Sequence, residues 1–290
     1  MKNRPAVLST FTLAWLAVGL WAPEPASEQS QQAAVSPLPA IPQLMREVVS
    51  HQKQLEKVRE NYTYSATVTT QYIDAAGQVK KTETEEQQIF FVNGHPVERT
   101  VKKNGQVLSG HSLDKETERM TKLVEKAEKT PSDQPLEGQE ISVGRLLKVM
   151  DVRNQRRESY RGRSAIVFDF VGRRDAQTHG LAEDASKKLQ GTLWVDEADR
   201  QIAHLDAVFN DNFHIGVGIV ANVQRGSNFH FDQALVNGEV WLPTGAEGTV
   251  QVRVLLVKSY RQHVVERNYD YKRFSVEAEQ GKGAKVAGAK

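Results

Sequence analysis

The residues that most suggest chemistry are four in a row, Asp196-Glu197-Ala198-Asp199, directly after a hydrophobic run. The same tetrad marks a large class of ATP-driven RNA helicases, in which the carboxylates hold magnesium opposite a GxxxxGK[ST] loop that binds the phosphates. The sequence has no such loop, because its Gly-Lys pair, Gly281-Lys282, lacks the upstream glycine. The flanking segments "GTLWV" and "RQIAHLDAVF" alternate like strands. We therefore predict that the tetrad is the turn of a β-hairpin and that the chain is not an ATPase.

Histidines and aspartates gather in a second stretch, where they could form a metal or acid/base site. Its members are His204, Asp206, Asp211, His214, His230 and Asp232. In "FHFD", His230 and Asp232 share one face of a strand, and a hairpin partner could bring His214 close to them. The favoured interpretation is nevertheless a polar solvent face, because the sequence contains neither an HExxH metal motif nor a GxSxG nucleophile elbow. We therefore expect no catalytic residue, no metal and no cofactor, and a protein that is not an enzyme.

Composition narrows the classes of function further. The 290 residues include 38 Lys and Arg against 36 Asp and Glu, so the formal charge is +2 and there is no basic field to hold a nucleic acid. The chain has no cysteine, which excludes a disulfide framework, a thiolate zinc site and a lipid-attachment cysteine. An ordinary protein of this length is large enough to bury a substantial core.

The N-terminal segment has the layout of a secretory signal peptide: a short basic start, an uncharged apolar stretch, then prolines and small polar residues. We expect residues 1–26 to direct export to the periplasm, with an uncleaved membrane anchor as the alternative. Residues 27–42, rich in Ser, Gln and Pro, are expected to be a flexible linker, and residues 277–290 a disordered tail. Residues 43–276 then form the folded domain.

The period of the hydrophobic residues divides this domain into helices and strands. Helical spacing occurs at 43–61, at 113–129 and, more briefly, at 142–150. Elsewhere the period is two, which predicts roughly nine to eleven strands in a largely antiparallel, meandering sheet of the α+β class. Asn-Gly and Gly-Ser pairs, which tolerate the positive φ of tight hairpin turns, stand at residues 93–94, 104–105, 226–227 and 237–238.

Four segments carry a resemblance to a known family: "YRGRSAIVFDF", "GTLWVDEADRQIAHLDA", "EVWLPTGAEG" and "YDYKRFSV". With the export signal and the opening amphipathic helix, they resemble the LolA/LolB/RseB-like superfamily of periplasmic proteins over about residues 40–276. The resemblance implies a strongly curved, half-open antiparallel β-barrel covered by a few α-helices, whose concave face can hold acyl chains. The family includes lipoprotein carriers, an outer-membrane acceptor and an envelope-stress sensor. A chain without cysteine cannot be a lipid-anchored acceptor.

A large curved sheet under a few helices can leave an apolar cavity, which would bind a greasy ligand. By strand alternation the candidate lining residues are Phe168, Phe170, Trp194, Phe229, Phe231, Trp241, Val252, Val254 and Leu256. For each of them, simple core packing is the commoner role of an inward apolar side chain.

We expect a non-enzymatic binder or carrier of lipid or lipoprotein acyl chains in the cell envelope. The alternative is an envelope sensor or protein-interaction module on the same fold. The expected partners are lipid or an acylated lipoprotein, with an envelope protein as a further partner and no nucleic acid. We expect the protein to be a monomer.

Overall fold

A computed structural model describes residues 37–132, 134, 136, 149–178, 180–215, 221–254 and 258–273. The chain divides into two compact units, Met1–Pro37 and Leu38–Lys290, and every element below belongs to the second. Four predictions fall mostly or wholly outside the described residues: the signal peptide at 1–26, the linker at 27–42, the short helix at 142–150 and the tail at 277–290.

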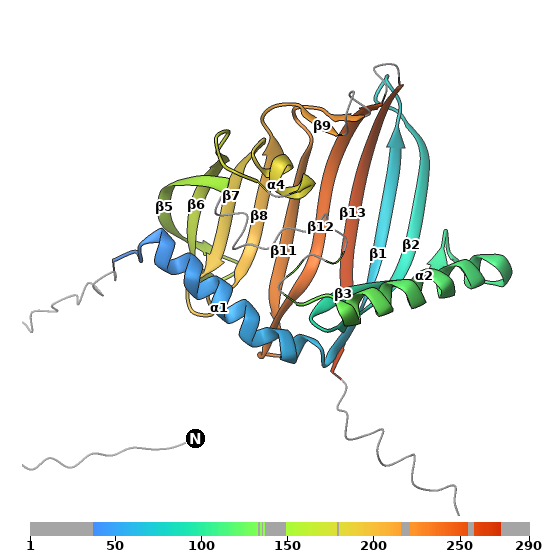
Figure 1. Ribbon diagram of the computed structural model, residues 1–290, viewed down its shortest axis with the longest axis horizontal. Coiled ribbons are helices and arrows are strands. Elements are labelled where there is room, and N and C mark those ends of the chain that lie inside the picture. The colour runs from blue at the N-terminus through green and yellow to red at the C-terminus, as the bar shows by residue number, and fades with distance from the viewer. Residues whose placement is uncertain are drawn as a thin grey trace, which may run out of the picture. The chain divides into compact units, whose positions relative to one another are not determined.

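Thirteen strands of the described residues form one antiparallel sheet, in the order β4-β3-β2-β1-β13-β12-β11-β8-β7-β6-β5, with the pair β9 and β10 attached to β12 (Figure 1). They are β1 (Tyr62–Ile73), β2 (Val79–Val92), β3 (His95–Lys103), β4 (Gln106–Val107), β5 (Met150–Tyr160), β6 (Arg163–Gly172), β7 (Leu189–Asp196), β8 (Ile202–Phe209), β9 (Phe213–Ile215), β10 (Ala221–Val223), β11 (Asn228–Val236), β12 (Val240–Val254) and β13 (Lys258–Arg273). The strand number exceeds the prediction because β4, β9 and β10 have only two or three residues each, too few for a readable period.

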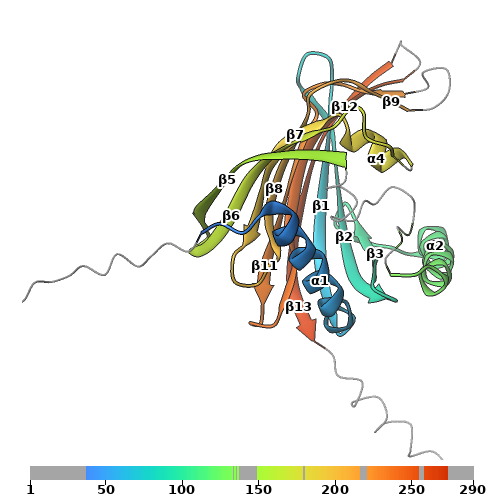
Figure 2. The same ribbon diagram turned by 60° about the vertical axis from the view of Figure 1, so that its left-hand side comes forward.

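The sheet is curved and open. Its outermost strands are β4 and β5, and in Figure 2 β5 and β6 curve away from the central strands. This arrangement confirms the predicted α+β class and the half-open, antiparallel architecture. A closed barrel would pair its two edge strands, and among the described residues β4 and β5 do not pair.

The sheet departs from a simple meander where β1 pairs with β13 and where β11 pairs with β8. The second departure shows that the predicted hairpin at Gly226-Ser227 is wrong, because β10 pairs with β9 and β12 rather than with β11. Gly226 does lie in a turn, with a φ of 89°. A turn residue alone, however, does not determine which strands pair. β11 places Phe231 opposite Leu205 of β8, so burial of apolar side chains on one face sets the pairing.

The other predicted turns are confirmed. Asn93-Gly94, Asn104-Gly105 and Asn237-Gly238 have positive φ at both positions, and they join β2 to β3, β3 to β4 and β11 to β12. The acidic tetrad likewise joins β7 to β8, which pair along their whole length from Leu189 opposite Phe209. The tetrad is therefore a hairpin turn, as its flanking sequence predicts.

Three helices are described, α1 (Ile41–Arg59), α2 (Gly110–Lys129) and α4 (Leu181–Ser186), and none of them is long and apolar enough to cross a membrane. We call the side of the sheet that carries α1 the inner face. α2 packs against Phe90, Val92 and Val97. Phe90 and Val92 alternate along β2 with Ile89 and Phe91, which belong to the clusters on the α1 side. α2 thus covers the outer face of β2 and β3.

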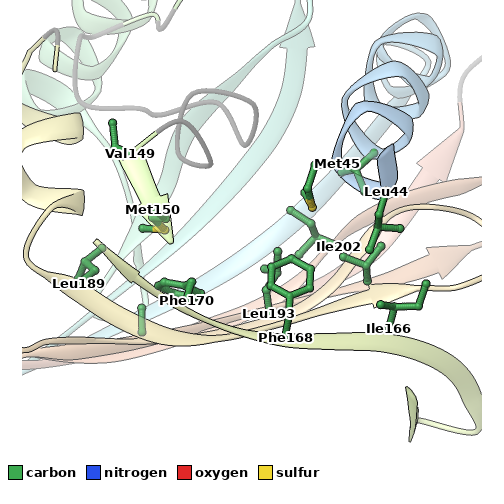
Figure 3. Close-up of a cluster of buried hydrophobic side chains, with 13 residues drawn as sticks. Leu44, Met45, Val149, Met150, Ile166, Phe168, Phe170, Leu189, Leu193 and Ile202 are labelled. Carbon is green, nitrogen blue, oxygen red and sulfur yellow. The ribbon is translucent and has the colours of Figure 1, made fainter. Parts of the chain in front are cut away.

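The largest buried cluster lies between α1 and strands β5 to β8 (Figure 3). Leu44 and Met45 project from α1 toward Ile202 of β8 in this view, and Leu44 and Val48 are fully buried. A buried leucine or valine stabilises the fold by about 1.5–3 kcal/mol relative to an exposed one. These contacts hold the helix on the sheet and so place it beside the cavity described next.

Candidate functional site

An apolar cavity of about 230 Å³ lies on the inner face, walled by β5, β6, β7, β8 and β11 and by single residues of α1 and α4. Ten of its thirteen described lining residues are apolar, and none of the thirteen carries a charge. The three polar ones are Gln52, Ser186 and Gln233. Such a lining suits an uncharged, mostly hydrocarbon ligand.

The register of the sheet explains why a hollow forms here. One row across four strands is large throughout, since Phe168, Leu193, Leu205 and Phe231 stand opposite one another in turn. The neighbouring row is Phe170, Gly191, Ala207 and Phe229, so two small residues lie between two aromatic ones. The ring of Phe170 lies over Gly191, and the small side chain of Ala207 leaves space above the sheet between that ring and Phe229.

Gly191 is needed for a local reason as well. A Cβ at this position would come within 3 Å of the Phe170 ring and of the Asp206 carbonyl. Glycine therefore lets the ring of Phe170 lie across β7, where it forms one end of the cavity.

Four of the predicted lining residues meet in this cavity, and the others do not. Phe168, Phe170, Phe229 and Phe231 line it together. Trp194, Trp241, Val252 and Val254 lie elsewhere, and Leu256 is outside the described residues.

The predicted residues that do not line the cavity lie elsewhere for different physical reasons. Trp194 directly follows Leu193, which lines the cavity, and successive side chains point to opposite faces of a strand. Trp194 therefore lies on the outer face of β7. Val252 and Val254 stand on the part of β12 that pairs with β10, and Trp241 is held at the turn between β7 and β8 by a bond to Asp199.

The lining residues that the sequence did not predict include Leu193, Leu205 and Ala207, and Gly191, which makes room for the Phe170 ring, was not predicted either. A usable signal existed. Once the tetrad is taken as a hairpin turn, Leu193 and Leu205 fall opposite each other, as do Gly191 and Ala207. The cavity combines these leucines and the small Ala207 with four phenylalanines, whereas the sequence prediction contained aromatic and aliphatic residues alone.

The outer face carries part of the predicted histidine and aspartate cluster. Tyr160 donates to Asp232 across 2.5 Å, and Nδ1 of His204 lies 2.8 Å from the same carboxylate oxygen. The His204 ring stacks on Tyr160 with centroids 5.2 Å apart and meets the edge of Trp194 at 4.8 Å. Burial would raise the pKa of Asp232, but the hydrogen bonds from Tyr160 and His204 outweigh it and hold that pKa below its usual range.

The sequence suggested that His214 lies close to His230 and Asp232, but in the structure His204 is the histidine beside Asp232. His204 stands opposite Asp232, whereas His214 is opposite Asn222 of β10 and Asp211 binds Lys188 at 2.9 Å. Within the described residues, no group of three or more histidine, aspartate or glutamate side chains is arranged to hold a metal ion. Here the polar face is a hydrogen-bonded network around one carboxylate.

The acidic tetrad is more than a solvated turn. Asp196 is 2% exposed and accepts hydrogen bonds from Arg163, at 2.5 Å, and from the backbone N–H of Asp199, at 2.8 Å. Burial alone would raise the pKa of Asp196, but these bonds outweigh it and the pKa lies below its usual value. Glu197 is bound by both Nε and Nη2 of Arg157, which lowers its pKa to about 2. Charge-assisted bonds of this kind fix the conformation of the turn.

The turn also contacts α1. Arg200 binds Glu47 of the helix across 2.7 Å, and Nδ1 of His51 lies 2.9 Å from the carbonyl oxygen of Asp199, which makes that nitrogen the donor. Bonds from Gln43 and Arg200 lower the pKa of Glu47. The helix that borders the cavity is therefore held both by apolar burial and by two polar contacts to this turn.

Comparison with solved structures returns proteins of the LolA type. An outer membrane lipoprotein-sorting protein domain from Vibrio parahaemolyticus has a TM-score of 0.37 and 10% identity, over 80% of this chain and 94% of that one. A LolA superfamily protein from Nitrosomonas europaea has a TM-score of 0.33 and 12% identity, over 80% and 96%. MucB, solved in complex with periplasmic MucA, has a TM-score of 0.24 and 10% identity, over 82% and 100%.

These names agree with the resemblance predicted from the sequence. No protein-family model matches the chain, and no curated protein matches it. Because each of the three TM-scores is below 0.5, the function proposed below rests on the geometry of this chain.

Proposed function

We propose that the protein is a non-enzymatic binder or carrier of the acyl chains of lipids or lipoproteins in the periplasm. The observation that supports this is the uncharged, mostly hydrocarbon lining of the inner-face cavity, formed where Gly191 and Ala207 lie between Phe170 and Phe229. An acyl chain placed there would gain roughly 0.8 kcal/mol for each buried methylene. The signal-peptide pattern of the sequence supports the location.

The size of the cavity sets the mode of binding. Sites for whole small molecules usually enclose about 300–1,000 Å³, whereas this one has about 230 Å³. In the conformation described, it accommodates a segment of one chain. A longer chain enters when α1, which contributes Gln52 to the wall, moves outward, and this movement must break its contacts with the sheet and with the turn.

Native mass spectrometry tests the proposal directly. The purified protein is expected to carry, or after delipidation to take up, one phospholipid or one acylated peptide per chain. An apo mass that stays unchanged when either is added contradicts lipid binding.

A matched pair of variants locates the ligand. Ala207→Leu extends the side chain into the cavity, whereas Val208→Leu adds bulk on the opposite face of the same strand. We expect Ala207→Leu to weaken the uptake of a dodecanoyl probe at least tenfold and Val208→Leu to leave it within twofold. Circular dichroism verifies that both variants are folded. Equal effects of the two substitutions would place the ligand elsewhere.

The alternative function is an envelope sensor or protein-interaction module. The small volume of the cavity supports it, because such a protein does not need to hold a whole lipid. The two functions give opposite results with delipidated protein. A carrier takes up lipid whether or not another protein is present, whereas a sensor stays in its apo form and binds an envelope protein irrespective of lipid.

A further inference from the structure

The solvent side of α1 carries a line of three cations. Arg46, Lys53 and Lys57 are exposed, and the exposed Ser50 stands among them. Successive residues of an α-helix are turned by about 100°, so these four positions fall within about 60° of one another around the axis. Along the axis they extend over about 16 Å. We call these four residues the α1 stripe.

The acidic residues of the helix do not lie on the stripe. α1 contains two of them, Glu47 and Glu56. They follow Arg46 and precede Lys57 in the chain, so each is turned about 100° away from the stripe. Glu47 binds Arg200 at 2.7 Å. Among the described residues, the three cations of the stripe have no carboxylate partner, and the stripe presents positive charge to the solvent.

This pattern differs from that of an ordinary solvated helix. In α2, Lys122 binds Glu118, four residues earlier, and opposite charges at this spacing stabilise a helix. In α1, Lys53 and Lys57 stand at the same spacing, at which like charges destabilise a helix. The helix dipole favours a cation in the last turn, such as Lys57, but it does not stabilise Arg46 in the second turn. Helix stability therefore does not account for the stripe.

The stripe lies on the helix that borders the inner-face cavity. Gln52 lines the cavity, and the next residue, Lys53, is exposed. The opposite side of the helix packs on the sheet, where Leu44 and Val48 are fully buried. Figure 1 shows α1 lying across the front of the strands. A flat surface that met the stripe would therefore lie along α1, on the side of the helix away from the sheet.

We propose that the α1 stripe docks the protein on the anionic phospholipid head groups of a membrane, with α1 lying flat on the surface. Each lysine or arginine near such a surface strengthens binding about fivefold, so three of them give about a hundredfold. The choice of a membrane rather than an acidic protein rests on the proposed function, because a carrier of acyl chains must meet the bilayer that supplies or receives them. The inference goes further by naming the side of the protein that faces the bilayer.

A single fluorescent label tests the docking surface. The chain has no cysteine, so one introduced cysteine carries one label. Ser50→Cys places a nitrobenzoxadiazole group within the stripe, and Ser112→Cys places the same group at an exposed position of α2 as the control. Each whole mature protein is mixed at low salt with vesicles of phosphatidylcholine alone or with about one third phosphatidylglycerol, an anionic fraction that attracts lysine and arginine.

The label reports only its own surroundings, so docking through another part of the chain does not affect it. We expect its emission at position 50 to shift to the blue with the anionic vesicles and not with phosphatidylcholine alone. The shift should disappear in about 0.5 M salt, where the Debye length is only about 4 Å. The label at position 112 should not respond.

Charge variants with the same net change connect docking to the stripe. The first variant combines Arg46→Gln, Lys53→Gln and Lys57→Gln. The control variant removes three exposed lysines of α2 by Lys115→Gln, Lys126→Gln and Lys129→Gln. Sedimentation with the anionic vesicles should show at least thirtyfold weaker binding for the stripe variant and less than threefold for the control. Both variants should take up the dodecanoyl probe in solution as the parent protein does.

The outcomes separate this inference from the proposed function. The docking surface is overturned if the label at position 50 does not respond, if it responds equally to both kinds of vesicle, or if the two charge variants lose binding equally. A response to soluble polyglutamate but not to vesicles would also overturn it, in favour of an acidic protein. Uptake of the dodecanoyl probe needs no vesicle, so its failure would contradict the acyl-binding function while a vesicle response still supported docking.

Discussion

The indole N–H of Trp241 donates a 2.9 Å hydrogen bond to the carboxylate of Asp199, and the two residues are 42 positions apart in the chain. The same carboxylate binds Arg163 at 2.7 Å, and the Arg163 guanidinium lies 5.6 Å above the centre of the Trp241 ring. These contacts join the β7–β8 turn to β6 and to the start of β12. The turn that carries the acidic tetrad is thus held by contacts to two strands, β6 and β12.

The Trp241 hydrogen bond should be measurable in stability. Trp241 is 3% exposed, so Trp241→Phe leaves Asp199 without a buried donor and removes packing, at an expected cost of about 1–3 kcal/mol in the free energy of unfolding. Trp194→Phe is the control, because Trp194 is only half-buried and its bond to Glu158 is longer, at 3.3 Å. Urea denaturation measures both. An equal loss of unfolding free energy in the two variants would show that the Trp241–Asp199 hydrogen bond does not stabilise the fold more than the Trp194–Glu158 bond.

Removing the guanidinium of Arg163 should leave Asp196 as a buried, uncompensated charge. Arg163→Met is expected to cost about 2–4 kcal/mol, less than a fully isolated charge, because the backbone N–H groups of Ala198 and Asp199 still bond Asp196. The pKa of Asp196 should rise in this variant, so its deficit should shrink in acid, where the carboxyl is protonated.

Arg156→Met is the control for Arg163→Met. Arg156 binds Glu158 and Asp169, whose side chains are far more exposed than that of Asp196, so this substitution should cost less than about 1 kcal/mol. A deficit of the same size in both variants, or one that does not depend on pH, would contradict the role given to Asp196.

Acid should weaken the fold through Glu197. Its folded pKa is about 2, against 4.5 for the free side chain, because Arg157 binds the ionised form. A lowered folded pKa contributes stability that is complete above about pH 4.5 and is lost as the pH falls toward 2. Glu197→Gln lacks this contribution, so we expect a deficit on the order of 1–3 kcal/mol at pH 6 that closes by pH 2. Denaturation series at both pH values check it, and a deficit independent of pH would rule it out.

The anchoring of α1 should depend far more on burial than on charge. Leu44 is fully buried, and Leu44→Ala should cost about 2–5 kcal/mol. The Glu47–Arg200 pair is partly exposed on both sides, so Glu47→Ala should cost less than about 1 kcal/mol. Hydrogen exchange of α1 amides, with urea denaturation, distinguishes the two. Faster exchange in Glu47→Ala than in Leu44→Ala would reverse the order.

The local patterns of the sequence predicted much of this fold. The first amphipathic helix, the second helix and three of the four paired turn signals are where the periodicity and the Asn-Gly pairs put them. Each of these depends on residues close together in the chain. The pairing of β11 with β8 was not predictable in this way, because it depends on matching the apolar faces of segments separated by β9 and β10.

Predicting the cavity requires the register between neighbouring strands as well as the hydrophobic pattern of each strand. Phe168 and Phe170 were found by alternation, but the hollow between Phe170 and Phe229 depends on Gly191 and Ala207 standing opposite each other. Small residues give no hydrophobic signal in a sequence. The charged contacts of Asp196 also depend on Arg163, which reaches it only after β6 and β7 have paired.

The first and last strands of the sheet, β1 and β13, lie side by side in its middle. Their pairing joins Tyr62 to Arg273, so it links the two ends of the described domain. Until the sixteen residues of β13 are made, β1 and β12 each keep an unpaired edge. Folding of this unit should therefore be slow, late and all at once, and the incomplete chain should be a natural client for chaperones.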